Sequence, residues 1–88
     1  MNAANKKKLR AEAHTLKPVV MIGQSGLTSG VLAELDQALN THELLKVRIR
    51  AERDVRKLIT EKICADSGAE LIQSIGQIAV IYRLNPNK

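Results

Sequence analysis

Apolar and polar positions along the chain change their period several times, and each change marks a new element. Residues 3–14 are rich in Ala, Lys and Leu and contain neither Gly nor Pro, which predicts a helix. Its apolar side is thin, so we expect it to lie on the surface. Pro18 restricts the preceding Lys17 to an extended conformation. The apolar run over residues 19–22 then predicts a short buried strand.

The middle of the chain shows a helical period followed by a strict alternation. Apolar residues recur at helical spacing between Val31 and Leu39, which predicts a second helix over about residues 28–41. From residue 45 to residue 51, Leu, Val, Ile and Ala alternate with Lys46, Arg48 and Arg50. A period of two predicts a strand with its apolar side chains on one face and its cations on the other.

The last third of the chain predicts one helix and one hairpin. Apolar residues over 55–63 favour a third helix, which Gly68 ends in a left-handed conformation. Strand-like segments at 71–74 and 78–82 flank Gly76, as in a β-hairpin. The predicted order is αβαβαββ in a single domain over residues 1–88. Strand–helix–strand units favour parallel pairing, and the hairpin adds antiparallel pairing. We therefore expect an α/β (mixed α+β) fold, with a four-stranded mixed sheet and three helices.

Charge is unevenly distributed along the chain. The formal net charge is +5 and the pI is about 9.7. One basic block extends to residue 27, a second covers residues 44–57, and the acids Glu34, Asp36 and Glu43 lie between them. Segregated positive charge is typical of proteins that bind polyanions, with nucleic acid ahead of a membrane surface. The alternative is a basic surface that serves solubility alone.

Catalysis and metal binding receive little support. His14 and His42 are the two histidines and Cys64 is the one cysteine, so no zinc set or Cys/His couple has the usual spacing. We expect Cys64 to be a small residue at the core boundary, and the single thiol fits a reducing cytoplasm. The N-terminal residues lack the apolar stretch of a signal peptide, and no apolar run is long enough to cross a membrane. We therefore expect no enzymatic activity, cofactor, metal, small-molecule substrate or membrane partner.

The loop between the first predicted strand and the second predicted helix reads Gly23-Gln24-Ser25-Gly26. It lacks the Lys-Ser/Thr ending of a Walker A loop and the glycine spacing of a dinucleotide-binding loop. Two glycines around a small polar pair allow a ligand to approach the backbone, beside helical amides that favour phosphate. KH domains use such a GXXG loop to clamp a nucleic-acid backbone. We favour this clamp over a plain tight turn.

The three cations of the alternating strand form the second candidate site. Lys46, Arg48 and Arg50 would stand about 6.6–6.8 Å apart on one face, a spacing compatible with a phosphate backbone. The alternative is a solvated strand that its charges keep soluble. Tyr82 is the one aromatic residue, so a sheet that stacks bases on aromatic side chains is disfavoured. The mode of RNA recognition that we favour is therefore contact with its phosphates and its shape.

Three segments in order carry a family resemblance: "HTLKPVVMIGQSGLTSGVLAELDQAL", "HELLKVRI" and "IGQIAVIYR". Together they resemble the CRM domain (chloroplast RNA splicing and ribosome maturation) in its stand-alone bacterial, YhbY-type form. The resemblance implies RNA binding and a fold similar to the C-terminal domain of the third translation initiation factor. It also implies association with precursors of the large ribosomal subunit, while plant relatives serve group II intron splicing.

The resemblance assigns the family's GXXG loop to Gly23, Gln24, Ser25 and Gly26. Members of the family often carry Lys inside this loop, whereas this chain has Gln24-Ser25. Because of that departure, we expect the backbone amides and the cations Lys17, Lys46 and Arg48 to contribute more to RNA binding. Arg50 is the next cation of the strand.

The residues predict a cytoplasmic, monomeric, non-enzymatic RNA-binding protein, and the resemblance implies that its partner is rRNA of the large-subunit precursor. One alternative is a translation factor that binds the small subunit, by likeness of fold. Another is a protein-interaction module whose basic face meets an acidic protein.

Overall fold

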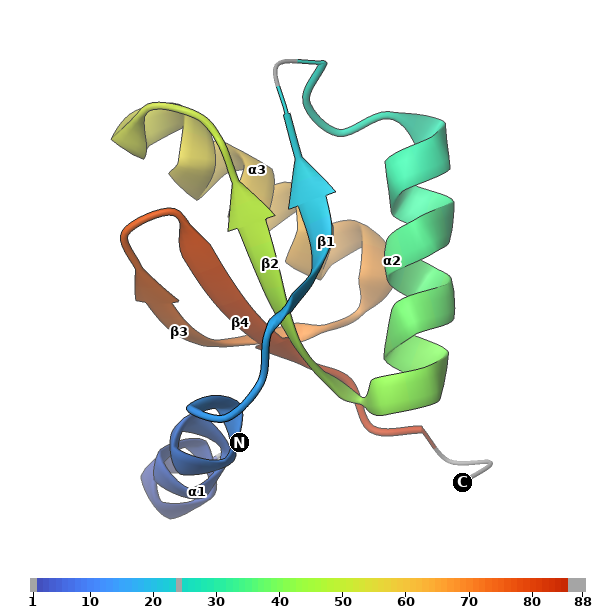
Figure 1. The fold of residues 1–88 in the computed structure, drawn as a ribbon. Helices are drawn as coiled ribbons and strands as arrows, with labels where there is room; N and C mark the ends of the chain where they lie inside the picture. The colour runs from blue at the N-terminus through green and yellow to red at the C-terminus, as the bar shows by residue number, and fades with distance from the viewer. Residues whose placement is uncertain (1, 24, 86–88) are drawn as a thin grey trace.

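The computed structural model describes residues 2–23 and 25–85 and shows three helices and one four-stranded sheet (Figure 1). The elements follow the predicted order αβαβαββ. They are α1 (Ala3–Ala13), β1 (Pro18–Ile22), α2 (Ser29–His42), β2 (Leu44–Ile49), α3 (Arg53–Ser67), β3 (Glu70–Ile75) and β4 (Ile78–Tyr82). The predicted fold class is therefore confirmed.

Local sequence signals set the ends of the helices. The amide of Asn5 donates to Oδ1 of Asn2 at 2.8 Å at the start of α1, and the amide of Val31 donates to Oγ1 of Thr28 at 3.2 Å at the start of α2. Such side-chain caps satisfy amides that have no partner within the helix. Gly68 ends α3 with φ of 75°, as predicted.

The strands lie in the order β1-β2-β4-β3. Strands β1 and β2 are parallel and are connected through α2, whereas β4 is antiparallel to both of its neighbours. The C-terminal strand thus inserts between β2 and β3. This arrangement brings the carboxyl ends of β1 and β2 to the same edge of the sheet, directly before α2 and α3 (Figure 1).

Helices cover the two faces of the sheet to different extents. On one face α2 and α3 pack over the main core, which contains Val20 and Ile22 of β1, alternate residues of β2, and Ala79 and Ile81 of β4. On the other face α1 contributes Ala13 and Leu9 to a small second cluster with Ile72 and Val80. Figure 1 shows α1 near the start of β1, at the opposite end from the loop that follows this strand.

Strand β2 is shorter than the alternation predicted, because it ends at Ile49 instead of continuing to residue 51. The amide of Arg50 still donates to the carbonyl of Ile22 at 2.9 Å. The amide of Ala51 instead bonds the carbonyl of Ile49 at 3.2 Å, and this turn directs the chain into α3. Arg50 therefore lies just past the strand, next to the end of β1.

Two negative findings concern the described residues. None of their helices is long and apolar enough to span a membrane. Within the same ranges, no group of three or more His, Cys, Asp or Glu residues is arranged to hold a metal ion.

Candidate nucleic-acid interface

The glycine loop projects from the edge where β1 ends (Figure 1). Gly23 and Ser25 are exposed, and Gln24, a predicted site residue, lies outside the described residues. The amide of Gly26 donates to the carbonyl of Gly23 at 3.0 Å, so the loop closes a turn of its own. That bond occupies one of the amides that we expected to be available to a phosphate.

The two glycines of this loop have different structural requirements. Gly26 has φ of 70°, a conformation that L-residues rarely adopt, so a turn alone accounts for this glycine. Gly23 does not adopt a positive φ, and a Cβ built on it would meet no atom within 4 Å. Neither backbone conformation nor packing inside the protein therefore requires glycine at residue 23.

The basic side chains of β2 point to the face that carries α1. Leu45, Val47 and Ile49 are buried on the α2/α3 face, so Lys46 and Arg48 project from the opposite face as the alternation predicted. Lys46 pairs with Pro18 of β1, and Arg48 pairs with Met21. Arg50 is exposed beside the end of β1.

This face is less open to solvent than we expected. Lys46 and Arg48 are half-buried, and residues of α1 lie beside Lys46. The Nε atom of Arg48 is buried and has no hydrogen-bond partner among the described residues.

The predicted cations form one line along the β1–β2 pair, which we call the basic line: Lys17, Lys46, Arg48 and Arg50. Exposed Lys17 directly precedes Pro18, which pairs with Lys46, so these two cations mark one end. Arg50 and the glycine loop mark the other end, about 13 Å from Lys46 along the strand. The structure thus brings Arg50 close to the loop and keeps Lys17 and Lys46 away from it.

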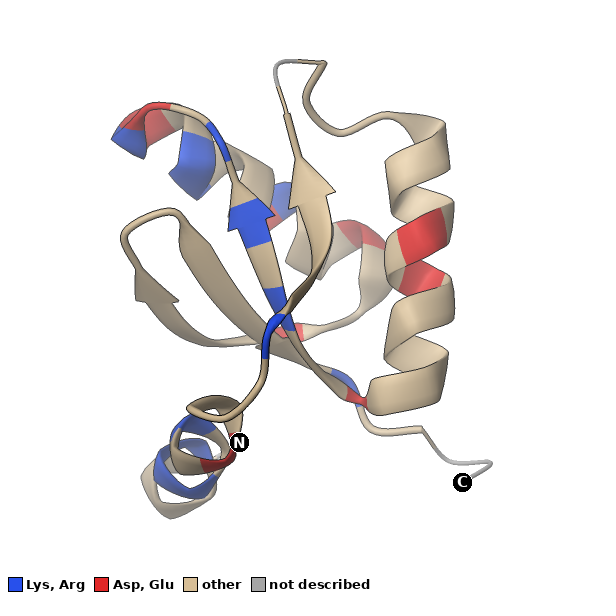
Figure 2. Ribbon diagram, viewed as in Figure 1, with Lys and Arg blue, Asp and Glu red and all other residues tan. Residues whose placement is uncertain are grey.

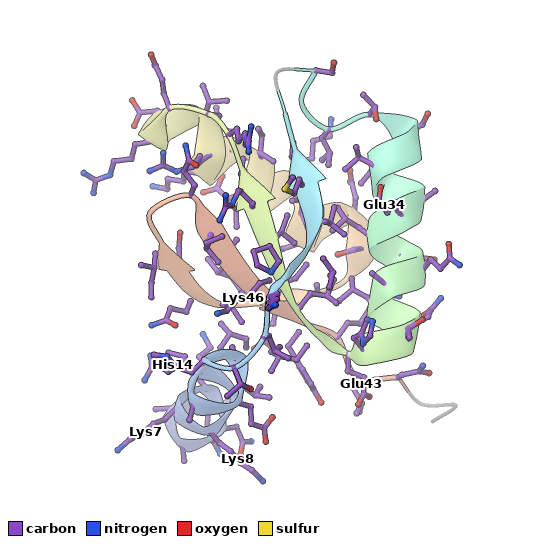
Figure 3. The ribbon with its side chains drawn as sticks, in the orientation of Figure 1. Lys7, Lys8, His14, Glu34, Glu43 and Lys46 are labelled. Atoms are coloured by element: carbon purple, nitrogen blue, oxygen red, sulfur yellow. The ribbon has the colours of Figure 1, made fainter. Side chains whose placement is uncertain are left out.

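Helix α2 carries acidic residues and no Lys or Arg, whereas α1 and α3 carry both signs of charge. Figure 2 shows negative residues on α2, away from the positive residues of β2. Figure 3 places Glu34 on this helix and shows Lys7 and Lys8 projecting from α1, away from the sheet. The separation of charge is therefore seen between α2 and β2, and it does not extend to α3.

Arg83, near the C-terminus, and Arg56, in the second basic block, have structural roles. Arg83 donates four hydrogen bonds to Asp36, Asn40 and the carbonyl of Ser67, at 2.8–3.1 Å. The guanidinium of Arg56 donates to the carbonyl of Ala51 at 2.8 Å. These contacts hold α2, α3 and the end of β4 together.

Cys64 is half-buried against the main core, as predicted. Burial, reinforced by the negative charge of Glu70, raises the pKa of its thiol. A protonated thiol is a poor nucleophile. The cysteine is accordingly a packing residue.

Sequence reasoning missed several residues that line a hollow beside Lys46. Arg10 and His14 lie four residues apart at the end of α1, and Gln73 joins them from β3. The spacing of Arg10 and His14 was a usable signal, since residues four apart share a helix face.

Comparison with known proteins agrees with the fold and with the family resemblance. The sequence model of the CRS1/YhbY (CRM) domain matches residues 1–83. A Pseudomonas aeruginosa protein named as a probable RNA-binding protein is 51% identical over 82 residues, which cover 92% of this chain and 79% of the relative. A Haemophilus influenzae RNA-binding protein is 46% identical over 84 residues, with coverage of 94% and 85%.

A solved structure is also similar along nearly the whole chain. It is the solution structure of a hypothetical Staphylococcus aureus protein, described as a proposed RNA-binding protein. It superposes with a TM-score of 0.84 at 32% identity, and the match covers 96% of this chain and 88% of that one.

Proposed function

Because the chain belongs to the CRS1/YhbY (CRM) domain family, we propose that it is a non-enzymatic RNA-binding protein. Its partner is rRNA in precursors of the large ribosomal subunit, and its role is to assist their assembly. It acts as a monomer in the cytoplasm, where ribosomes are assembled. The names of its relatives and the two basic regions support RNA as the ligand. The ribosomal part rests on the family resemblance.

The observation that carries the proposal is the basic line ending at the glycine loop. Lys17, Lys46, Arg48 and Arg50 follow one strand pair, and the exposed backbone of Gly23 lies at its end. Cations along a strand neutralise successive phosphates and release counterions, which drives binding to any RNA of suitable shape.

The glycine loop adds a contact that side chains cannot make. A glycine at residue 23 leaves its backbone open to solvent, with no side chain to keep a phosphate at a distance. Backbone amides recognise phosphate in GXXG loops of this kind. The amide of Gly26 is already bonded to Gly23, so the clamp relies on the other exposed backbone of the loop and on nearby Arg50.

The ribosomal role is tested by locating the protein in cells. Lysate is fractionated on sucrose gradients at low magnesium, once at low salt and once at high salt. We expect the protein to co-sediment with precursors of the large subunit and to leave them at high salt. Co-sedimentation with the small subunit would favour a translation factor instead. A complex that persists in the presence of excess rRNA would instead indicate a protein partner.

The RNA-binding surface is tested by a triple substitution of Lys46, Arg48 and Arg50 with Gln. We expect weaker binding to large-subunit rRNA with the fold retained, since none of the three side chains belongs to the buried core and substitutions outside it usually change stability by no more than about 0.5 kcal/mol each. Replacing Lys6, Lys7 and Lys8 with Gln removes the same charge from α1 and is the matched control. Equal loss in both variants would show a general charge effect and contradict the basic line as a contact surface.

A further inference from the structure

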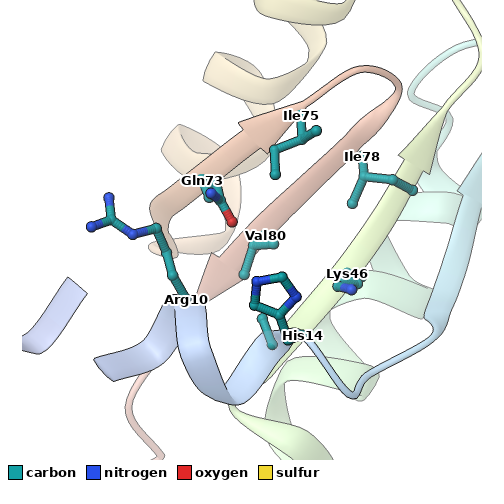
Figure 4. A pocket seen from close by; sticks show the side chains of 8 residues that line it. Arg10, His14, Lys46, Gln73, Ile75, Ile78 and Val80 are labelled. Atoms are coloured by element: carbon teal, nitrogen blue, oxygen red, sulfur yellow. The ribbon is translucent and has the colours of Figure 1, made fainter. Parts of the chain in front are cut away.

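A hollow of about 180 Å³ lies between the end of α1 and the sheet (Figure 4). Its floor is apolar and is formed by Ile75, Ile78 and Val80 of the β3–β4 hairpin. Arg10, Ala13 and His14 of α1 form one wall, and Lys46 and Gln73 complete the rim. Figure 4 shows the imidazole of His14 standing over the hollow beside Val80 and Lys46.

An irregularity in β3 directs Gln73 to this hollow. The pairing of β3 with β4 shifts between Leu71 and Gln73, so that Leu71 lies opposite Ile81 and Gln73 lies opposite Val80. Ile72 and Gln73 therefore both face α1, although consecutive strand residues normally point to opposite faces. A β-bulge of this type re-aims a side chain. Figure 4 shows the carboxamide of Gln73 pointing toward Val80.

The lining chemistry matches a flat heterocycle that carries a phosphate. The eight lining residues include the cations Arg10 and Lys46 and no carboxylate. An apolar floor with a few polar groups is typical of a small-ligand site. Cavities of about 150 Å³ are large enough to hold benzene. Lys46 is also part of the basic line, so a ligand in the hollow would be continuous with an RNA backbone on that line.

We propose that this hollow binds one unpaired nucleobase of the RNA. The inference rests on the proposed RNA binding and adds a site for a base to the phosphate contacts. The imidazole of His14 stacks on one side of the base, and the methyl groups of Ile78 and Val80 contact the other. Lys46 holds the adjoining phosphate. The carboxamide of Gln73 has both a donor and an acceptor to offer to the edge of the base.

The site requires an unpaired nucleotide of the RNA. Bases within a duplex are stacked and cannot enter a hollow, whereas bulges and loops present bases that side chains can reach. The scarcity of aromatic residues in the sequence does not oppose this mode, because histidine is among the side chains that stack on bases. The protein would therefore prefer rRNA with a bulged nucleotide near its phosphate contacts.

The proposal is tested by NMR titration of the full chain with the four nucleoside 5′-monophosphates. Ribose 5-phosphate, which lacks the base, is titrated in parallel. We expect the nucleotides to shift the methyl signals of Ile78 and Val80 and the side-chain amide of Gln73. Ribose 5-phosphate should leave these signals unchanged. The proposal would be overturned if ribose 5-phosphate caused the same shifts as the nucleotides, or if no nucleotide caused a shift.

Variants separate stacking from a structural effect. Replacing His14 with Ala should weaken nucleotide binding at least about fivefold, the lower range for loss of a ring–base contact. Replacing His42, the other histidine, with Ala is the control on α2. Gln73→Met keeps the length of the side chain and should reduce the differences in affinity among the four bases. Unchanged affinity in His14→Ala would contradict the site.

Failure of this site is distinguishable from failure of RNA binding. Wild-type protein that binds large-subunit rRNA but shows no base-dependent shifts retains the proposed function and loses the nucleobase site. Wild-type protein that binds no rRNA loses the proposed function, whatever the mononucleotides do.

Discussion

At the scale of single residues, the two loop glycines provide a matched pair. Gly26 has φ of 70°, and an L-residue in that conformation costs about 1 kcal/mol or more. We expect Gly26→Ala to lower the free energy of unfolding by that amount. Gly23→Ala meets open space and should leave stability unchanged or raise it by about 0.4–1 kcal/mol. Chemical denaturation measures both.

The same pair tests the backbone clamp. A methyl group on residue 23 keeps a phosphate away from the exposed backbone, so Gly23→Ala should weaken rRNA binding while the protein remains stable. A plain turn instead predicts that this variant binds RNA as tightly as the wild type. Retained affinity would therefore refute the clamp.

Cys64 predicts how stability depends on pH. Burial raises the pKa of its thiol, so the folded chain holds this proton more tightly than the unfolded chain. The stabilisation is complete below the thiol pKa of the unfolded chain and is lost as pH rises through the raised pKa of the folded chain. We expect Cys64→Ala to remove part of the alkaline decline in the free energy of unfolding. An identical decline in both proteins would contradict the shift.

At the scale of elements, Arg83 connects the end of β4 to two helices. It donates to Asp36 and Asn40 of α2 and to the carbonyl of Ser67 at the end of α3. Arg83→Met should lower the free energy of unfolding by about 2–3 kcal/mol, since it leaves several acceptors without their charged donor. Asp36→Asn should cost less than about 1 kcal/mol, because this carboxylate is 60% exposed. Equal losses would contradict a central role for Arg83.

The sequence predicted the helices and strands better than it predicted which strands lie next to each other. Period and caps reveal local structure, so all seven elements and Gly68 at the end of α3 were predictable. A period of two assigns each residue to a face of the sheet, but it does not identify the partner strand. The insertion of β4 beside β2 was therefore not predictable. The cations of β2 were assigned to the correct face. Their partial burial depends on α1. This helix contacts the sheet through Ala13, and one small apolar residue hardly changes the hydrophobic pattern of the sequence.

The bulge in β3 shows the same limit at the candidate site. Regular alternation assigns Ile72 and Gln73 to opposite faces, whereas the shifted pairing turns both toward α1. The residues of the hollow come from α1, β2, β3 and β4, and only tertiary packing brings them together. The glycine loop and the cations at residues 46, 48 and 50 were predictable because each set lies within one short segment, whereas Lys17 joins these cations only through the pairing of β1 with β2.

At the scale of the whole molecule, segregated charge predicts a strong dependence of RNA binding on salt. Five or six phosphate contacts should lower rRNA affinity by roughly a few hundred- to a few thousand-fold between 50 and 200 mM salt. The triple Gln variant lacks three of these charges, so its log–log slope should be shallower by about 2.7. Filter binding over a salt series measures both slopes. Affinity that hardly changes would contradict electrostatic recognition.

Helix α1 is attached to the rest of the fold by a small cluster in which Ala13 is its one buried residue among those described. Segments with few buried apolar contacts open at lower free energy than the core. Its amides should therefore exchange with deuterium sooner than those of β2. Since α1 forms one wall of the hollow, a base bound there would contact the helix and oppose its opening. Exchange of the α1 amides should therefore slow when RNA occupies the hollow.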